Sequence, residues 1–322
     1  MMIILESVFQ FYSQHSYLTM STKSPKSKHR ELQSSDPKDA QSNPQDSSSM
    51  PTDSRPQMWK LDDFDLAYNI GKGRFGSVFA VRSKKEKLFV AIKVLFKRTI
   101  DENDLRDQVK DEIEIQYHLL HPNILRLKGF FHDEHRVFII TEYAKSGSLN
   151  VRIRNKGKLD EFEAARYCRQ VADALNYCHG KGVIHRDVKP ENIFLDGSGN
   201  IKLADFGYAI IATVGRGQPC GTLEYMAPEI INEATFNHTI DNWAVGVLLF
   251  EMLVGQSPFH YSSTGNIVKA IIACKFDIPN SVRVEPSNLI KKLIVKDSSK
   301  RATLYDVLAH PWIKTMSGVA VK

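Results

Sequence analysis

The residues with the most chemical character lie close together in the run HRDVKPEN at positions 185–192. Asp205 follows Asn192 by 13 positions, and both side chains offer oxygen ligands of the kind that Mg²⁺, a hard cation, prefers. Asp187 can orient an attacking hydroxyl and accept its proton, and Lys189 can steady a transferring group. Phosphoryl transfer needs such positioned charge and metal more than it needs covalent help from the protein. This spacing therefore predicts phosphoryl-transfer chemistry.

A glycine-rich run and a lysine precede these residues. Gly71, Gly73 and Gly76 lie between two expected strands, where their backbone can approach phosphates without Cβ clashes. A dinucleotide-binding turn is disfavoured, because it requires a helix after the glycines. Lys93 ends the apolar run VAIK, and a lone buried ammonium is costly, so we expect Glu112 to pair with it and hold it toward the α- and β-phosphates. Two simpler readings stay open, glycines that only form a turn and a Lys93 that reaches solvent.

A second expected ion pair lies far from this run in sequence. Glu229 ends the tripeptide APE, and a buried glutamate there needs a cation, for which Arg301 is the obvious candidate. Any one of these short motifs could arise by chance. The complete set in this order and at these spacings is the signature set of the protein kinases.

The elements that must position these residues change character along the chain. Before position 147 the pattern indicates short strands with one helix, and beyond it mainly helices. The sequence therefore predicts an α+β fold of two lobes, a small β-rich one with one main helix and a larger α-helical one, with the site in the cleft between them. The expected strands are 64–69, 77–81, 89–96, 124–131, 136–142 and 201–204, and the expected helices are 101–120, 161–180 and 241–253.

Composition suggests three parts. Residues 1–57 are rich in Ser, Pro, Asp, Lys and Gln from position 21 onward, so we expect a disordered N-terminal extension. Residues 58–314 are the expected catalytic domain, with its lobes at about 58–143 and 144–314, and 315–322 are a short tail. Glu6 and Gln10 interrupt the apolar start of the chain and no basic residue precedes it, which disfavours a secretory signal.

Charge, hydropathy and cysteine content limit the partners. The formal charge of +6 lies in residues 58–322, because basic and acidic residues balance at six each in 1–57. Spread over that length, the excess favours a solvated basic face over direct nucleic-acid binding. No apolar run has the roughly 18 residues of a membrane span. The four cysteines lack CxxC spacing, which fits a reducing compartment such as cytoplasm or nucleus.

Four runs make the chain resemble one kinase family, the Aurora serine/threonine kinases. They are VLFK at 94–97, EIEIQ at 112–116, HPNILRL at 121–127 and CGTLEY at 220–225, within a kinase resemblance that spans about 64–314. Gln116 stands where most kinases have an apolar residue and where Auroras have glutamine. The resemblance implies ATP and Mg²⁺ as cofactors, protein substrates, a role in cell division, and a place at the spindle or centrosome.

The same resemblance implies roles for individual residues. Adenine would lie between the side chains of Ile70, Val78, Ala91 and Phe194, and its edge would form hydrogen bonds with the backbone at Glu142 and Ala144. Lys189 and Thr222 follow the serine/threonine-specific pattern. An arginine two residues before the acceptor would be bound by Glu191 and Glu251.

This chain departs from the family in the segment that controls activity. Gln218 stands where Auroras carry a phosphorylated threonine, and Asp111 replaces an arginine that helps to bind the phosphate, while Arg186 and Arg216 remain. One hypothesis is that Asp111 pairs with Arg216 or Arg186 and partly replaces the phosphate. The alternative is relaxed constraint in a divergent copy. Auroras are also switched on by peptides that grip the small lobe, and such a partner would matter more here.

Smaller departures concern the nucleotide pocket. Thr141 stands at the gatekeeper position, where the family usually has leucine, and Phe194 replaces a smaller residue on the pocket floor. Tyr208 replaces a tryptophan. We expect these changes to alter inhibitor preference more than ATP binding.

A different class of function remains to be weighed, a pseudokinase that acts as a docking scaffold. Pseudokinases usually lack at least one of the residues that bind metal or nucleotide or act in catalysis. Lys93, Asp187, Asn192 and Asp205 are all present here. The sequence therefore favours an active enzyme.

Overall fold

The computed structural model describes residues 59–73, 76–212, 214–215 and 219–318. Chain contacts separate residues 58–322, as one unit, from residues 1–57. The expectations for the N-terminal extension, for Arg216 and for Gln218 therefore lie outside the described residues. In the described part no helix is long and apolar enough to cross a membrane.

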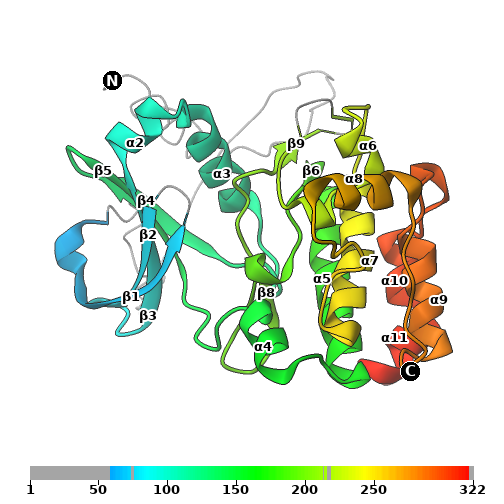
Figure 1. Cartoon of the computed structure of the whole chain (residues 1–322). Coiled ribbons are helices and arrows are strands. Elements are labelled where there is room, and N and C mark those ends of the chain that lie inside the picture. Colours follow the sequence, from blue (N-terminus) through cyan, green and yellow to red (C-terminus); the bar gives the residue numbers. More distant parts are fainter. Residues whose placement is uncertain (1–58, 74–75, 213, 216–218, 319–322) are drawn as a thin grey trace, which may run out of the picture. The chain divides into compact units, whose positions relative to one another are not determined.

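The small lobe is built on a five-stranded antiparallel sheet with the strand order β1-β2-β3-β5-β4 (Figure 1). The β-branched and aromatic side chains that suggested strands in the sequence lie in this sheet. A short 3₁₀ turn, η1 (Leu61–Asp63), leads into it. Its elements are β1 (Phe64–Gly73), β2 (Gly76–Ser83), β3 (Phe89–Phe96), α2 (Lys97–Glu102), α3 (Arg106–His118), β4 (Leu127–His132) and β5 (Arg136–Glu142).

One expected helix is two helices in the structure. The pattern predicted a single helix over 101–120, but α2 ends at Glu102 and α3 begins at Arg106. Between them Asp104 has a φ of 52°, in the left-handed region that a continuous helix does not contain. The expected strand over 124–131 also starts later, at Leu127, because Ile124 forms an isolated parallel bridge with Leu203 instead.

The large lobe is mainly helical, and the structure also describes two short antiparallel strand pairs in it. Its helices are α4 (Leu149–Lys156), α5 (Glu161–Gly180), α6 (Pro228–Ile231), α7 (Thr239–Val254), α8 (Thr264–Ala273), α9 (Val284–Leu293), α10 (Leu304–Ala309) and α11 (Pro311–Met316). Its strands are β6 (Val183–Ile184), β7 (Ile193–Leu195), β8 (Ile201–Leu203) and β9 (Ile210–Ile211), and its 3₁₀ turns are η2 (Pro190–Asn192), η3 (Leu223–Tyr225) and η4 (Ser298–Lys300).

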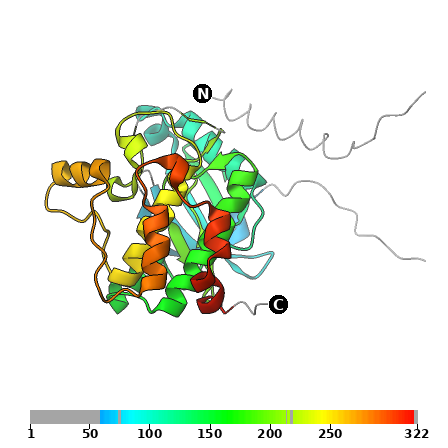
Figure 2. The same cartoon turned by 90° about the vertical axis from the view of Figure 1, so that its right-hand side faces the viewer.

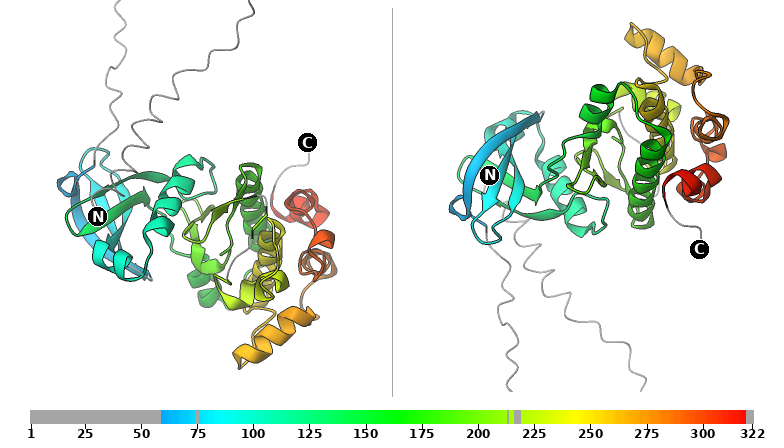
Figure 3. Two further views of the ribbon diagram at one scale, coloured as in Figure 1. Left: turned by 90° about the horizontal axis from the view of Figure 1, so that it is seen from above. Right: turned by 90° about the horizontal axis from the view of Figure 1, so that it is seen from below.

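Helix α7 is the centre of this lobe. It is buried along most of its length and packs against both α5 and α9, while α10 and α11 pack on α5. Gly246 permits the close approach of α9, since a Cβ there would lie 2.7 Å from the Cβ of Leu293. Helix α8 projects from the edge of the lobe (Figures 2 and 3). The expected boundary after residue 314 falls inside α11, which continues to Met316.

Candidate active site

A cavity of about 510 Å³ is lined by residues of both lobes. Twelve of the residues expected to act in catalysis or to bind nucleotide, metal or substrate contribute to its wall. They are Ile70, Gly71, Val78, Ala91, Lys93, Glu112, Glu142, Ala144, Glu191, Asn192, Phe194 and Asp205. The sheet register explains part of this grouping, because Val78 on β2 is paired with Lys93 on β3. The wall of the cavity also includes Gln116, Leu125, Ile139 and Thr141.

The expected phosphate-binding glycines lie in the hairpin of β1 and β2. β1 and β2 pair as a hairpin up to Gly73 and Gly76, and the two residues between them lie outside the described part. A Cβ on Gly76 would lie 2.0 Å from the carbonyl oxygen of Val94, so no other residue fits without moving the strand. At this position glycine is required by the sheet itself. Gly71 has open space around it and lines the cavity.

Lys93 and Glu112 form the expected ion pair. The Lys93 Nζ atom lies 2.7 Å from Glu112 Oε1 and 3.0 Å from Oε2, and Glu112 is buried. Burial lowers the pKa of the Lys93 ammonium, but the charges of Glu112 and Asp205 raise it more, so that its net pKa lies above the ordinary value. Lys93 is therefore held inside the cleft as a cation, and the reading in which it reaches solvent is excluded.

Three residues contact the carboxylate of Asp187, which lies in the catalytic loop (residues 185–192). Asn192 Nδ2 donates to Asp187 Oδ2 at 2.8 Å, and Lys189 Nζ lies 2.8 Å from the same oxygen. Lys189 also donates to Thr222 Oγ1 at 2.8 Å, and the Thr222 backbone N–H donates to Asp187 Oδ1 at 3.2 Å. Asp187 is 3% exposed, so this network fixes the direction of its carboxylate.

Asp205 follows β8 and lies next to the catalytic loop, since the N–H of Ala204 donates to the carbonyl oxygen of Asn192. Asp205 has a φ of 62° and faces the cavity, while Phe206 behind it is buried against the ring of His185. Among the described residues no group of three or more His, Cys, Asp or Glu could hold a metal. One carboxylate and one amide still suit Mg²⁺, which takes its other ligands from phosphates and water.

Asp241 is a residue that the sequence reasoning missed. Its carboxylate accepts the backbone N–H groups of His185 and Arg186 at 2.9 and 3.0 Å and lies 2.8 Å from His179 Nε2. Burial raises the pKa of Asp241, but these hydrogen bonds and the neighbouring histidines lower it further, to below its ordinary value. A carboxylate inside an apolar helix was the available signal, because such a group needs partners.

The expected substrate glutamates lie on one face of the large lobe. Glu251 accepts a hydrogen bond from the Tyr225 hydroxyl at 2.5 Å, and Glu191 is exposed beside the cavity. Burial raises the pKa of Glu251, and the negative charges of Glu191 and Glu224 add to this effect. Tyr225 and Glu224 were not expected here from the sequence. Together the three carboxylates make a region that favours a cationic side chain.

The structure describes only part of the site where Asp111 was expected to replace a bound phosphate. Arg216 and Gln218 lie outside the described residues. Asp111 is exposed on α3, and within the described part it forms no ion pair with Arg186, whose Nε donates instead to the Tyr208 carbonyl at 2.6 Å. The pairing of Asp111 with Arg186 is therefore not formed among the described residues, and the alternative pairing with Arg216 lies outside them and stays a hypothesis.

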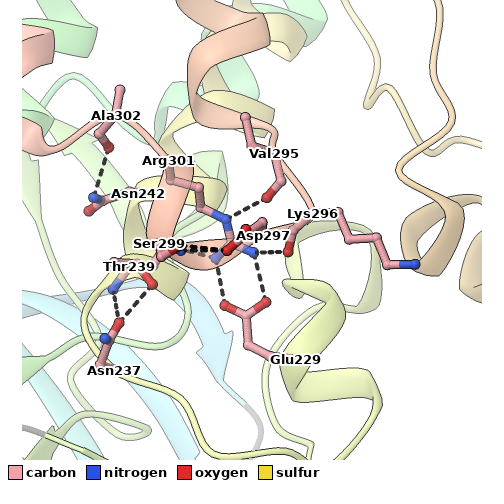
Figure 4. Close-up of polar contacts among 10 residues, drawn as sticks. All are labelled: Glu229, Asn237, Thr239, Asn242, Val295, Lys296, Asp297, Ser299, Arg301 and Ala302. Atoms are coloured by element: carbon pink, nitrogen blue, oxygen red, sulfur yellow. Dashed lines mark hydrogen bonds and ion pairs between the residues drawn. The ribbon is translucent and has the colours of Figure 1, made fainter.

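The Glu229–Arg301 pair is formed, deep in the large lobe (Figure 4). The two guanidinium nitrogens lie 2.5 and 2.7 Å from the two carboxylate oxygens, which is bidentate geometry. Arg301 also donates to the carbonyl of Val295 at 2.8 Å and that of Thr239 at 3.2 Å, and its side chain is fully enclosed.

Comparison with known proteins places this geometry in context. The family model of the protein kinase domain matches residues 64–313. An Aurora kinase of Dictyostelium discoideum is 48% identical over 257 residues, covering 80% of this chain and 67% of that protein. Aurora kinase B of Danio rerio is 42% identical over 265 residues, covering 82% and 83%. Aurora kinase A-A of Xenopus laevis is 42% identical over 260 residues, covering 80% and 64%.

Proposed function

This chain belongs to the protein kinase family and, within it, to the Aurora kinases, and we propose how the residues of its cleft carry out the activity of that family. The activity is ATP-dependent phosphorylation of serine or threonine in protein substrates, with Mg²⁺, in an Aurora-like role in the cell cycle. The observation that carries the assignment is the joining of Lys93 to Glu112 in the cleft that Asp205 also faces.

The phosphate end of ATP is assigned to the charged end of the cleft. Lys93, held by Glu112, would bind the α- and β-phosphates, and Asn192 and Asp205 would hold the Mg²⁺ ion. When bound, the ion would supply positive charge that offsets the negative charge developing on the transferred phosphate. Gly71, Gly73 and Gly76 cover the phosphates with backbone N–H groups. Gly76 also keeps β2 close to β3, which fixes this cover relative to Lys93.

The adenine end is assigned to the apolar part of the same cavity. Ile70, Val78 and Ala91 form one wall and Phe194 the opposite one, and all four line the cavity. The backbone at 142 and 144 then offers hydrogen-bonding groups to the adenine edge. The Glu142 side chain steadies this segment, because it accepts the backbone N–H of Arg126 at 2.9 Å and lies 2.9 Å from Lys202 Nζ.

The acceptor hydroxyl is assigned to Asp187. In the structure Asp187 faces Lys189 and Thr222. Asp187 orients the hydroxyl and takes its proton, while Lys189 balances the charge on the transferring group. No covalent intermediate on the protein is needed.

The substrate preference is assigned to Glu191 and Glu251, which would bind an arginine two residues before the acceptor. Charge-assisted hydrogen bonds of this kind contribute about 1.5–3 kcal/mol each. The raised pKa of Glu251 supports the assignment, since a substrate arginine would offset the negative charges of Glu191 and Glu224 that help to raise it. Arrays of Arg-x-Ser/Thr peptides and their alanine counterparts measure this preference directly.

The competing function is that of a scaffold without transferase activity. The decisive experiment is transfer of labelled phosphate from ATP to a generic arginine-containing substrate, with Asp187→Asn as control. We expect wild-type transfer that the substitution abolishes. Absence of transfer from folded, Mg·ATP-binding protein, even beside an activating peptide, would leave the scaffold as the function.

Location and partners follow from the family. We assign the protein to cytoplasm and nucleus and, during mitosis, to the spindle or centrosome, with an activating peptide bound to the small lobe near α3. No direct contact with nucleic acid or membrane is assigned. Fluorescent tagging in dividing cells, together with affinity capture by the small lobe, tests both points.

A further inference from the structure

Gln108 joins the small lobe to the segment that carries Asp205. It lies on α3 one turn before Glu112, so both side chains point to the same side of the helix. Its Nε2 donates to the carbonyl oxygen of Gly207 at 2.5 Å, across 99 residues of sequence. Both Gln108 and Gly207 line the cavity, and Gln108 is half-buried there.

The turn at Gly207 is tightly surrounded. A Cβ on Gly207 would lie 3.2 Å from Asp205 Oδ1, 3.4 Å from Glu112 Oε2 and 3.6 Å from Gln108 Nε2. Asp205 has its backbone in the left-handed region, which is unfavourable for a residue other than glycine. Such a conformation persists only where its surroundings hold it. The two side chains of α3 supply part of those surroundings.

The next carbonyl oxygen along the chain is held from the other lobe. Arg186 Nε donates to the Tyr208 carbonyl at 2.6 Å, and the backbone of Arg186 is fixed in turn by Asp241. Two consecutive carbonyls after Phe206 are therefore bound by side chains, Gly207 from the small lobe and Tyr208 from the large lobe. Each lobe therefore contributes one side chain that holds this turn by a hydrogen bond.

From these contacts we propose that Gln108 is a positioning residue, whose amide latches α3 to the Asp205–Gly207 turn and so keeps the Lys93–Glu112 pair aligned with Asp205. The inference deepens the proposed function and rests on the roles given there to Glu112 and Asp205. Asp111, the anchor expected from the sequence, does not reach Arg186. Gln108 makes the equivalent connection without a phosphate.

The latch should act on the chemical step more than on binding. Gln108 contacts the turn that carries a metal-binding residue, while the adenine end of the cavity is formed by other residues. Loosening the latch lets α3 move away from the turn, which separates Lys93 and Asp205 from their working positions. Small misplacements of this kind reduce turnover strongly, while metal-free nucleotide binding is retained.

The test replaces the amide and then restores its donor. Gln108→Met keeps the side-chain length but removes the N–H, and we expect kcat to fall about tenfold with the KM for peptide unchanged. The thermal midpoint should stay within about 2 °C, as for substitutions outside the core. Gln108→His, assayed at pH 8 with a neutral ring, offers an N–H again and should restore most of kcat. Asp107→Asn, exposed on the same helix, is the matched control and should behave as wild type.

Hydrogen exchange in the nucleotide-free protein tests the contact between Gln108 and Gly207 independently of activity. Gln108→Met should speed exchange in 106–118 and 205–208 and not elsewhere. An unchanged kcat in Gln108→Met overturns the proposal. So does a loss of kcat that accompanies a drop in thermal midpoint and is not restored by Gln108→His, since the role would then be structural. Inactive wild-type protein that still shows the exchange difference supports the latch and overturns the proposed function.

Discussion

The Glu229–Arg301 and Lys93–Glu112 pairs use the same chemistry in two regions with opposite consequences. Arg301 is fully enclosed and is also bound to three backbone carbonyls, so its position is determined by the large lobe alone. Lys93 is 29% exposed, faces the cavity, and depends on a glutamate carried by a separate helix. An enclosed pair fixes structure, whereas a pair at a cavity wall can exchange partners when a ligand arrives.

Breaking the enclosed pair should have the largest effect. Arg301→Ala leaves the Glu229 carboxylate without its cation, and we expect a loss of about 3–5 kcal/mol in the free energy of unfolding. Urea unfolding followed by the fluorescence of Trp243, which lies buried beneath Arg301, measures it. Lys300→Ala breaks an exposed pair with Asp297 and should change stability by less than about 1 kcal/mol. Equal losses in the two variants would remove the contrast.

Breaking the pair in the cleft should change activity and leave folding intact. Lys93→Met removes the cation assigned to the phosphates, and we expect kcat to fall by about 10²–10³-fold. Glu112 also loses its cation, so some fall in the thermal midpoint is expected, and the rate is measured at a temperature where the variant remains folded. Single-turnover phosphorylation gives the rate, and Lys84→Met, at an exposed pair with Asp65, is the control. Retained turnover would show that Lys93 is not placed as assigned.

Glu251 extends the comparison to a half-buried carboxylate whose cation would come from the substrate. Glu251→Gln keeps the shape and the hydrogen-bonding capacity toward Tyr225 but removes the charge. We expect kcat/KM for an Arg-x-Ser peptide to fall about tenfold relative to the alanine peptide. Glu285→Gln, exposed beside Arg283, should leave the ratio unchanged. An equal preference in both variants contradicts the assignment.

The smallest effect is the pH dependence of that preference. The pKa of Glu251 is raised above its ordinary value of 4.5 by burial and by neighbouring carboxylates. Glu251 therefore takes up its proton at a higher pH than an exposed glutamate, and the preference for arginine should decline as the pH falls toward that raised pKa. Initial rates with the two peptides from pH 8 to pH 5 measure the decline. A wild-type profile as flat as that of Glu251→Gln would exclude this charge as its source.

Much of the site could be predicted because the chemistry restricts residue types. Asp187, Asn192 and Asp205 follow one another at diagnostic spacings, and two of the expected ion pairs form. Gln108 gave no such signal, because a glutamine in the first turns of a helix looks like an ordinary surface residue. Its acceptor is a backbone carbonyl 99 residues away, which no sequence pattern marks.

The fold was predictable in type but less so in its boundaries. Runs of β-branched and aromatic residues indicated the strands, and the amphipathic pattern of residues 161–180 indicated the full length of α5. The break between α2 and α3 was missed because Asn103 and Asp104 fit a continuous polar face as well as a turn. Of the two pairings expected for Asp111, the one with Arg186 is not formed among the described residues, where Arg186 Nε donates to the Tyr208 carbonyl, and the one with Arg216 lies outside them.

The short side chain of Thr141 has a practical consequence for pharmacology. Since Thr141 lines the cavity together with Gln116 and Leu125, a ligand bearing a bulky group beside position 141 meets a short side chain there. Where a relative has leucine at this position, the same group meets a branched side chain. A compound of that shape would distinguish this enzyme from such relatives, and a methionine introduced at position 141 would confer resistance.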